Sequence, residues 1–128
     1  MYAFTYHRAS GLRQAGNMLG KLEDAKLLAG GQTLLPTMKQ RLASPANIVD
    51  LGSVEGMSGI ELKGRSIVIG AMTKHAEVTS SPIVQENLPA LAYLAGLIGD
   101  PAVRHRGTTH PRARATTGTR PAQLWKTC

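Results

Sequence analysis

The residues of this sequence that are best suited to chemistry form one short run, Ala29-Gly30-Gly31-Gln32-Thr33. Two adjacent glycines let the backbone turn sharply and expose consecutive N–H groups. The run lies between an apolar segment and the start of a predicted helix, whose amino end carries a partial positive charge. Such an arrangement can hold a phosphate or pyrophosphate, with Thr33 as a hydroxyl donor. A glycine pair of this kind also serves in purely structural tight turns, so both interpretations stay open on this pattern.

Alternating strands and helices are expected to position the glycine turn. Apolar residues at strand or helix spacing predict strands and helices at Phe4–Tyr6, Gly11–Leu19, Ala25–Ala29, Leu34–Leu42 and Ile48–Leu51. Ala25–Ala29 is nearly continuous in its apolar character, which favours a buried strand of a parallel sheet. The order strand, helix, strand, glycine turn, helix, strand predicts a small parallel sheet with right-handed crossovers.

The second half of the chain has a different pattern. Its predicted elements are an antiparallel hairpin and then helical segments, at Ile60–Leu62, Ser66–Met72, Ala76–Val78, the residues after Ser81-Pro82, and Ala90–Ile98. The hairpin turns through Lys63-Gly64-Arg65, where a glycine is favoured. The last helix has Leu91, Leu94, Ala95 and Ile98 on one apolar stripe. The predicted fold class is therefore α+β, with a parallel β/α part first and an antiparallel part second.

Composition limits the chain to one modest domain and to few kinds of site. It has 128 residues, 42% of them hydrophobic, and its longest apolar stretches fall far short of the roughly 20 residues that a membrane span needs. No secretion signal is recognisable at the amino end, so we expect a cytoplasmic protein. Cys128 is the one cysteine, which excludes an internal disulfide and a cysteine-ligated iron–sulfur or zinc site. Any redox centre must therefore be an organic cofactor or belong to a partner protein.

No set of residues has a recognisable catalytic or metal-binding spacing. His7, His75, His105 and His110 fit no helical ligand pair, so we expect no metal site. No Ser-His-Asp, Cys-His or paired-carboxylate pattern supports a hydrolase. We therefore predict no catalytic residue in this chain.

Other prominent side chains have structural explanations. Tyr6 and Tyr93 lie on apolar stripes and are predicted to be half-buried core aromatics. Arg104 and Arg106 are expected to be a solvated pair after the last helix. The alternative for this pair is contact with a cofactor phosphate or a partner subunit.

The formal net charge of +7 is concentrated near the carboxyl end. Residues 1–100 contain nine Lys or Arg and eight Asp or Glu, whereas residues 101–128 contain six basic residues and no acidic one. A basic tail can bind nucleic acid through its phosphates, so a small α/β binding module is the alternative function. Trp125 is the one aromatic residue of this tail, and no stacking pattern is present. Nucleic acid is therefore not the expected partner.

A long run of residues resembles a family signature. The residues from Lys26 to Ala43, KLLAGGQTLLPTMKQRLA, are similar to the first FAD-binding signature of the medium subunits of molybdenum hydroxylases, the carbon monoxide dehydrogenase and xanthine dehydrogenase type. Further matches occur in the family's order, at Phe4–Arg8, Ile48–Leu51, Ile69–Thr73, Leu88–Leu91, Ile98–Pro101 and Val103–Thr108. The resemblance covers residues 2–108, which is most of the chain.

The resemblance implies a fold, a cofactor and a set of binding residues. Members of the family have a PCMH-type, vanillyl-alcohol-oxidase-like FAD domain, in which a small parallel β/α subdomain precedes a larger antiparallel-sheet subdomain. By resemblance, the Ala29–Thr33 turn holds the FAD pyrophosphate and the Ile69–Thr73 region lies along the cofactor. The residues that the resemblance assigns to FAD are Ala29, Gly30, Gly31, Gln32, Thr33, Leu34, Ala71, Thr73, Gly107 and Thr108.

The same resemblance implies electron transfer within a larger complex. In the family, the flavin receives electrons from a molybdopterin centre on a large subunit through [2Fe-2S] clusters on a small subunit. This chain would supply the flavin step of an oxidoreductase, as in carbon monoxide dehydrogenase. The substrate chemistry, the molybdopterin and the iron–sulfur clusters would all belong to partner subunits.

The sequence departs from the family pattern after Thr108. Family members continue with a second glycine pair, whereas this chain reads Thr109-His110-Pro111-Arg112, in which the proline removes a backbone donor. We therefore expect a partial, incomplete FAD domain at residues 1–106, divided into 1–52 and 53–106, and a disordered basic tail at 107–128. Such a truncated chain is expected to bind FAD weakly or not at all and to be inactive in isolation. A shifted reading frame is one hypothesis, which rereading the coding DNA would test.

Overall fold

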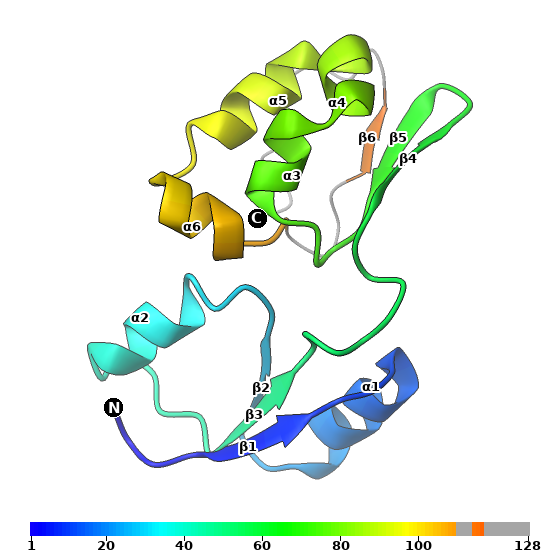
Figure 1. Ribbon diagram of the computed structural model, residues 1–128. Coiled ribbons are helices and arrows are strands. Elements are labelled where there is room, and N and C mark those ends of the chain that lie inside the picture. The colour runs from blue at the N-terminus through cyan, green and yellow to red at the C-terminus, as the bar shows by residue number, and fades with distance from the viewer. Residues whose placement is uncertain (110–113, 117–128) are drawn as a thin grey trace. The chain divides into compact units, whose positions relative to one another are not determined.

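The computed structural model describes residues 1–109 and 114–116. The chain separates into two compact units, Met1–Glu55 and Gly56–Cys128. Each unit has its own sheet and its own helices (Figure 1). The division lies close to the boundary predicted after residue 52.

The first unit is a parallel sheet with a helix in each crossover. Its elements in chain order are β1 (Thr5–Arg8), α1 (Leu12–Lys21), β2 (Ala25–Leu28), α2 (Leu34–Lys39) and β3 (Asn47–Asp50). The strand order is β1-β3-β2, and both neighbours of β3 run parallel to it. The predicted order of elements and the predicted parallel sheet are therefore confirmed.

The central position of β3 explains which strand of this unit is buried. The chain passes from β1 to the far edge at β2 and then returns to the middle. Two right-handed crossovers in opposite directions place their helices on opposite faces of a sheet, as α1 and α2 lie in Figure 1. Ile48 and Val49 point to opposite faces of β3 and are both buried. The prediction of a buried strand at Ala25–Ala29 is wrong, because β2 is an edge strand whose Lys26 and Leu27 are exposed.

Helix α2 ends before Leu42, its predicted end. Arg41 takes a left-handed φ of 61°. The N–H of Leu42 donates to the carbonyl of Thr37, and the N–H of Arg41 donates to the carbonyl of Met38. This pair of bonds is the Schellman arrangement, which satisfies the last carbonyls of a helix. The Arg41 guanidinium also lies 5.7 Å from the ring centroid of Tyr2, a cation–π contact that supports the same turn.

Several bulky side chains of the first unit lie at its surface. Helix α1 buries Ala15, whereas Leu12 and Leu19 are exposed. Tyr6 is 48% exposed, and its hydroxyl donates to the carboxylate of Asp50. The prediction that Tyr6 is a core aromatic is therefore wrong, although about half of its surface is covered. It lies on an edge strand, where its phenol bonds to a carboxylate instead of packing under a helix.

The second unit combines an antiparallel sheet with short helices. Its elements in chain order are β4 (Ile60–Lys63), β5 (Ser66–Ile69), α3 (His75–Ser80), α4 (Pro82–Asn87), α5 (Pro89–Gly96), α6 (Pro101–Arg106) and β6 (Arg114–Thr116). Strand β5 lies between β4 and β6 and is antiparallel to both. The hairpin turns through Gly64, which has a φ of 62°, and Arg65. The predicted hairpin and the predicted helical segments are confirmed.

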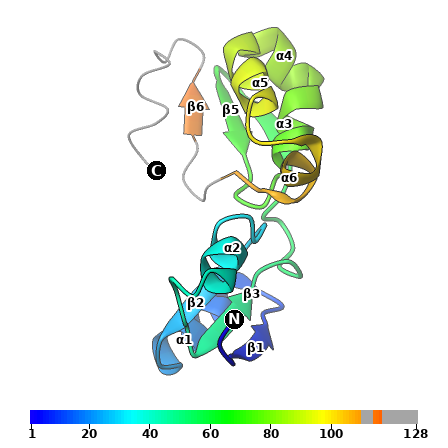
Figure 2. The ribbon, with the colours of Figure 1, turned by 90° about the vertical axis from the view of Figure 1, so that its left-hand side faces the viewer.

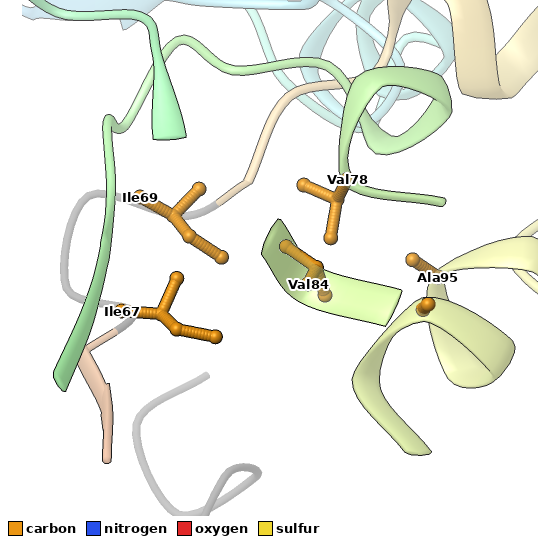
Figure 3. Packing of buried hydrophobic residues seen from close by; sticks show 6 residues of the cluster. Ile67, Ile69, Val78, Val84 and Ala95 are labelled. Carbon is orange, nitrogen blue, oxygen red and sulfur yellow. The ribbon is translucent and has the colours of Figure 1, made fainter. Parts of the chain in front are cut away.

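The core of the second unit lies between β5 and three helices. Ile67 and Ile69 of β5 point toward Val78 of α3, Val84 of α4 and Ala95 of α5 (Figure 3). All five side chains are buried. Figure 2 shows α3, α4 and α5 together on the same side of β5. The two isoleucines face this side because alternate residues of a strand point to the same face of its sheet.

Helix α5 buries its alanines most deeply, and of the predicted stripe Ala95 lies in the core and Leu91 packs against it. Ala92 and Ala95 are buried. Small side chains let α5 lie close to α3, where a Cβ added to Gly96 would be 3.5 Å from the methyl group of Thr79. Tyr93 lies away from this face and is 68% exposed. The prediction of Tyr93 as a core aromatic is therefore wrong, because the alanine face of the helix is the buried one.

Helix α6 was absent from the predicted elements, although it begins with a recognisable signal. The Asp100 carboxylate accepts the N–H of Val103 at 2.8 Å, and a proline occupies the first helical turn, a typical helix start. The Arg104 guanidinium donates to the carbonyls of Gly99 at 2.8 Å and Ile98 at 3.3 Å. The prediction of a solvated Arg104 is therefore wrong, since this half-buried side chain joins α6 to the loop that follows α5.

Parts of the segment predicted to be disordered have regular structure. Gly107 is buried, and Thr108 forms an antiparallel bridge with Lys74. Strand β6 pairs with β5. Residues 110–113 and 117–128, the rest of that segment, lie outside the described residues.

Two glycine-to-alanine changes should have opposite effects on stability. A Cβ added to Gly70 would lie 2.4 Å from the carbonyl oxygen of Met57, so we expect Gly70→Ala to lower the free energy of unfolding by about 1–3 kcal/mol. Gly16 lies inside α1 with nothing within 4 Å of an added Cβ, so Gly16→Ala should raise it by about 0.5–1 kcal/mol. Urea denaturation followed by circular dichroism measures both. Equal tolerance of alanine at the two positions would contradict the close approach at Gly70.

The stability of the chain should depend on the protonation of His75, the first residue of α3. Burial lowers the pKa of His75 below its ordinary value, because the charged imidazolium loses hydration. The unfolded chain then takes up this proton at a higher pH than the folded chain. Lowering the pH from about 7.5 to about 5.5 should therefore decrease the free energy of unfolding.

Urea titrations at several pH values measure this decrease. His75→Gln should reduce it, whereas His105→Gln retains the half-buried imidazole and should leave it in place. An unchanged pH dependence in His75→Gln would show that burial of this side chain has no part in it.

Candidate functional site

The glycine turn of the first unit joins β2 to α2. Gly31 has a φ of 76°, a left-handed conformation that favours glycine. A Cβ at this position would lie 2.9 Å from Cδ1 of Leu35 and 3.5 Å from Cδ1 of Leu28. Ala29 is exposed and Gly30 is half-buried. Both the backbone conformation and the packing of the leucines therefore require glycine at position 31, which makes the sharp turn possible.

The residues that follow Gly31 present polar groups to solvent. Gln32 and Thr33 are exposed, and Leu34 is half-buried. Thr33 precedes α2, and its side chain makes no capping hydrogen bond. Its carbonyl accepts the N–H of Thr37 at 3.2 Å and the hydroxyl of Thr37 at 2.7 Å. At the start of α2, the N–H of Leu35 donates to the carbonyl of Gly31 at 3.1 Å and Pro36 has no N–H. The turn can therefore offer a phosphate group its exposed polar residues, Gln32 and Thr33, and the positive end of the helix.

The remaining predicted residues lie on two adjacent segments of the second unit; they are Ala71, Thr73, Gly107 and Thr108. The N–H of Thr109 donates to the carbonyl of Thr73 at 2.8 Å, and the N–H of His75 donates to the carbonyl of Gly107 at 3.0 Å. The bridge between Lys74 and Thr108 lies between these two bonds. Residues 73–75 and 107–109 therefore run antiparallel, side by side, and Ala71 lies in the turn just before them.

The hydroxyl of Thr73 is engaged within the protein. Its side chain is fully buried. The hydroxyl accepts the N–H of Gly59 at 2.9 Å and donates to the carbonyl of Gly59 at 3.0 Å. The hydroxyl of Thr109 donates to the carbonyl of Gly70 at 2.9 Å. Gly59 and Thr109 were not predicted to have a role, and Gly70 was predicted only as part of the Ile69–Thr73 region, because the residues that they bond are distant in sequence.

The two groups of predicted residues belong to different units. Among residues 1–109 and 114–116, no three His, Cys, Asp or Glu side chains gather where they could hold a metal ion. Of the helices in these ranges, none has both the length and the apolar character needed to cross a membrane.

Sequence comparison identifies relatives with established names. A family model described as "FAD binding domain in molybdopterin dehydrogenase" matches residues 2–110. The carbon monoxide dehydrogenase medium chain of Hydrogenophaga pseudoflava is 50% identical over 106 residues, which are 82% of this chain and 37% of that protein. The nicotine 6-hydroxylase medium subunit of Paenarthrobacter nicotinovorans is 40% identical over 106 residues, which are 83% of this chain and 38% of that protein.

Solved structures of similar enzymes have the same fold. A carbon monoxide dehydrogenase structure from Hydrogenophaga pseudoflava matches with a TM-score of 0.81 and 49% identity, covering 84% of this chain and 38% of that chain. Quinoline 2-oxidoreductase from Pseudomonas putida 86 matches with a TM-score of 0.80 and 34% identity over the same shares. The predicted α+β fold is confirmed, and the chain spans 37–38% of the length of these relatives. This chain belongs to the family of FAD-binding domains of molybdopterin dehydrogenases.

Proposed function

We propose that this chain binds FAD and acts as the electron-transferring flavin part of a molybdenum-containing hydroxylase or dehydrogenase, such as carbon monoxide dehydrogenase. The observation that carries the proposal is the glycine turn at residues 29–33. It combines a left-handed glycine, exposed polar residues and a helix start in a chain of an FAD-binding family. Bound FAD supplies the capacity to accept and release electrons.

The residues of the glycine turn have separate tasks in this proposal. Backbone N–H groups of the turn and the hydroxyl of Thr33, which makes no capping hydrogen bond, would donate to the negatively charged pyrophosphate. Gly30 adds no side chain where the phosphate approaches the backbone, and Gly31 keeps the turn sharp. Ala71, Gly107 and Thr108 of the second unit remain assigned to the cofactor by the resemblance.

The names of the relatives indicate which partner subunits to propose. Two of them are named as a medium chain and a medium subunit of enzymes, so we propose a large molybdopterin subunit and a small [2Fe-2S] subunit as partners, in the cytoplasm. Relatives named for carbon monoxide, nicotine and quinoline share this segment. The segment therefore serves a step common to several substrates. Neither the fold nor these relatives support the alternative of a nucleic-acid-binding module.

Titration of the purified 128-residue chain with FAD tests the proposal. Flavin fluorescence should change saturably, even if the binding is weak. Gly31→Asp should weaken binding by at least about tenfold, because it places a negative charge beside the pyrophosphate and a strained residue at a φ of 76°. Gly64→Asp is the matched control: Gly64 has a similar left-handed φ of 62° in the β4–β5 turn, and nothing lies within 4 Å of a Cβ added there. The change therefore adds the same charge and a similar backbone strain outside the glycine turn.

Two results would overturn the proposed function. One is the absence of saturable FAD binding by a parent chain whose circular dichroism shows it to be folded. The other is the same FAD affinity for Gly31→Asp and Gly64→Asp, which would mean that the glycine turn is not the binding site.

A further inference from the structure

Three segments of the second unit meet where β5 ends. A Cβ added to Gly70 would lie 2.4 Å from the carbonyl oxygen of Met57, so the backbones of residues 57–59 and 70–73 are in direct contact. The N–H of Met72 donates to the carbonyl of Met57 at 2.8 Å, and the N–H of Gly70 donates to the carbonyl of Gly59 at 2.9 Å. The N–H of Thr73 donates to the carbonyl of Gly70 at 3.0 Å and closes the turn that contains Ala71.

The hydroxyl of Thr73 fastens this turn to residues 57–59. It bonds to both backbone groups of Gly59, which has a φ of 129° that favours glycine. Valine has the same shape as threonine but offers no hydrogen bond. With valine at position 73, both of these part-buried hydrogen bonds to Gly59 would be lost, and removing one partner of such a bond destabilises the arrangement.

The hydroxyl of Thr109 fastens the same turn from the other side. It lies 2.9 Å from the carbonyl oxygen of Gly70 and 3.2 Å from that of Thr73. One hydroxyl proton serves one acceptor well at a time, and the shorter distance favours Gly70. The backbone N–H of Thr109 meanwhile holds the carbonyl of Thr73 at 2.8 Å. The segment 107–109 is thereby tied to the turn by side chain and backbone together.

We propose that Thr73 and Thr109 are positioning residues of the FAD site, and we call their two hydroxyls the hydroxyl clamp. The clamp holds the turn with Ala71 and the segment with Gly107 and Thr108 in fixed places, while both hydroxyls bond to the protein's own backbone and not to the cofactor. This inference rests on the proposed function. The resemblance assigns Thr73 to the cofactor, whereas in this proposal Thr73 supports the neighbouring residues that contact it.

Paired substitutions in the full chain separate the hydroxyl from the shape of the side chain. Thr73→Val and Thr109→Val remove each hydroxyl, whereas Thr73→Ser and Thr109→Ser retain it. Each valine variant should bind FAD about tenfold more weakly than the parent chain, and each serine variant within about threefold of it. Thr79→Val is the control, because the Thr79 hydroxyl only bonds back to the carbonyl of His75 within α3.

Hydrogen exchange of the backbone amides tests the hydroxyl clamp independently of FAD affinity. Amide hydrogen exchange without FAD should be about tenfold faster at Gly59 in Thr73→Val than in the parent chain, with Ile67 and Val68 of β5 still protected. Circular dichroism of the bound flavin should change in the valine variants and return to the parent spectrum in the serine variants.

Each outcome decides a different part of the inference. Unchanged exchange at Gly59 in Thr73→Val would overturn the clamp. Faster exchange with unchanged FAD affinity would show that the clamp is structural only and would overturn its positioning role. If the parent chain does not bind FAD, the proposed function fails and the positioning role falls with it, while the exchange data still show whether the hydroxyls fasten the three segments.

Discussion

The unpaired backbone groups at the ends of short elements are the constraint on which the rest of this structure depends. The longest helix of the described chain has ten residues, and the strands have three or four. A large share of their N–H and C=O groups therefore find no partner inside the element. Single side chains supply many of these partners. Asp100 receives an N–H of α6, Arg104 donates to carbonyls beyond α5, and Thr73 serves both groups of Gly59.

This constraint separates what could be predicted from the sequence from what could not. Periodicity and glycine turns reveal the order of elements, because those signals lie within a few consecutive residues. Burial is decided by neighbours that are distant in sequence. The apolar run of β2 would suit a central strand equally well, but β3 occupies the centre. Tyr93 has the hydrophobicity of a core residue, but α5 turns its alanines inward. Helix α6 was missed even though the Asp100-Pro101 pair marks its start.

The candidate site divides in the same way. The glycine turn could be recognised because its residues are consecutive and its chemistry needs only backbone groups and one hydroxyl. The residues of the second unit came from resemblance alone. The partners of Thr73 lie 14 residues before it, at Gly59, and 36 residues after it, at Thr109. No local pattern relates positions that far apart, so the bonds among these threonines and glycines appear only in the folded chain.

Synthesis on the ribosome separates the two units in time. The first sheet is complete once β3 has emerged at Asp50, but the bonds around Gly70 need Thr109. The ribosome adds roughly 5–20 residues per second, so the synthesis of the stretch from Asp50 to Thr109 takes roughly 3–12 seconds. The glycine turn of the nascent chain can fold within that interval. During these seconds the isoleucines of β5 stay uncovered until α5 has emerged at Gly96, because their core partners lie on α3, α4 and α5. Transiently exposed apolar side chains of this kind favour aggregation.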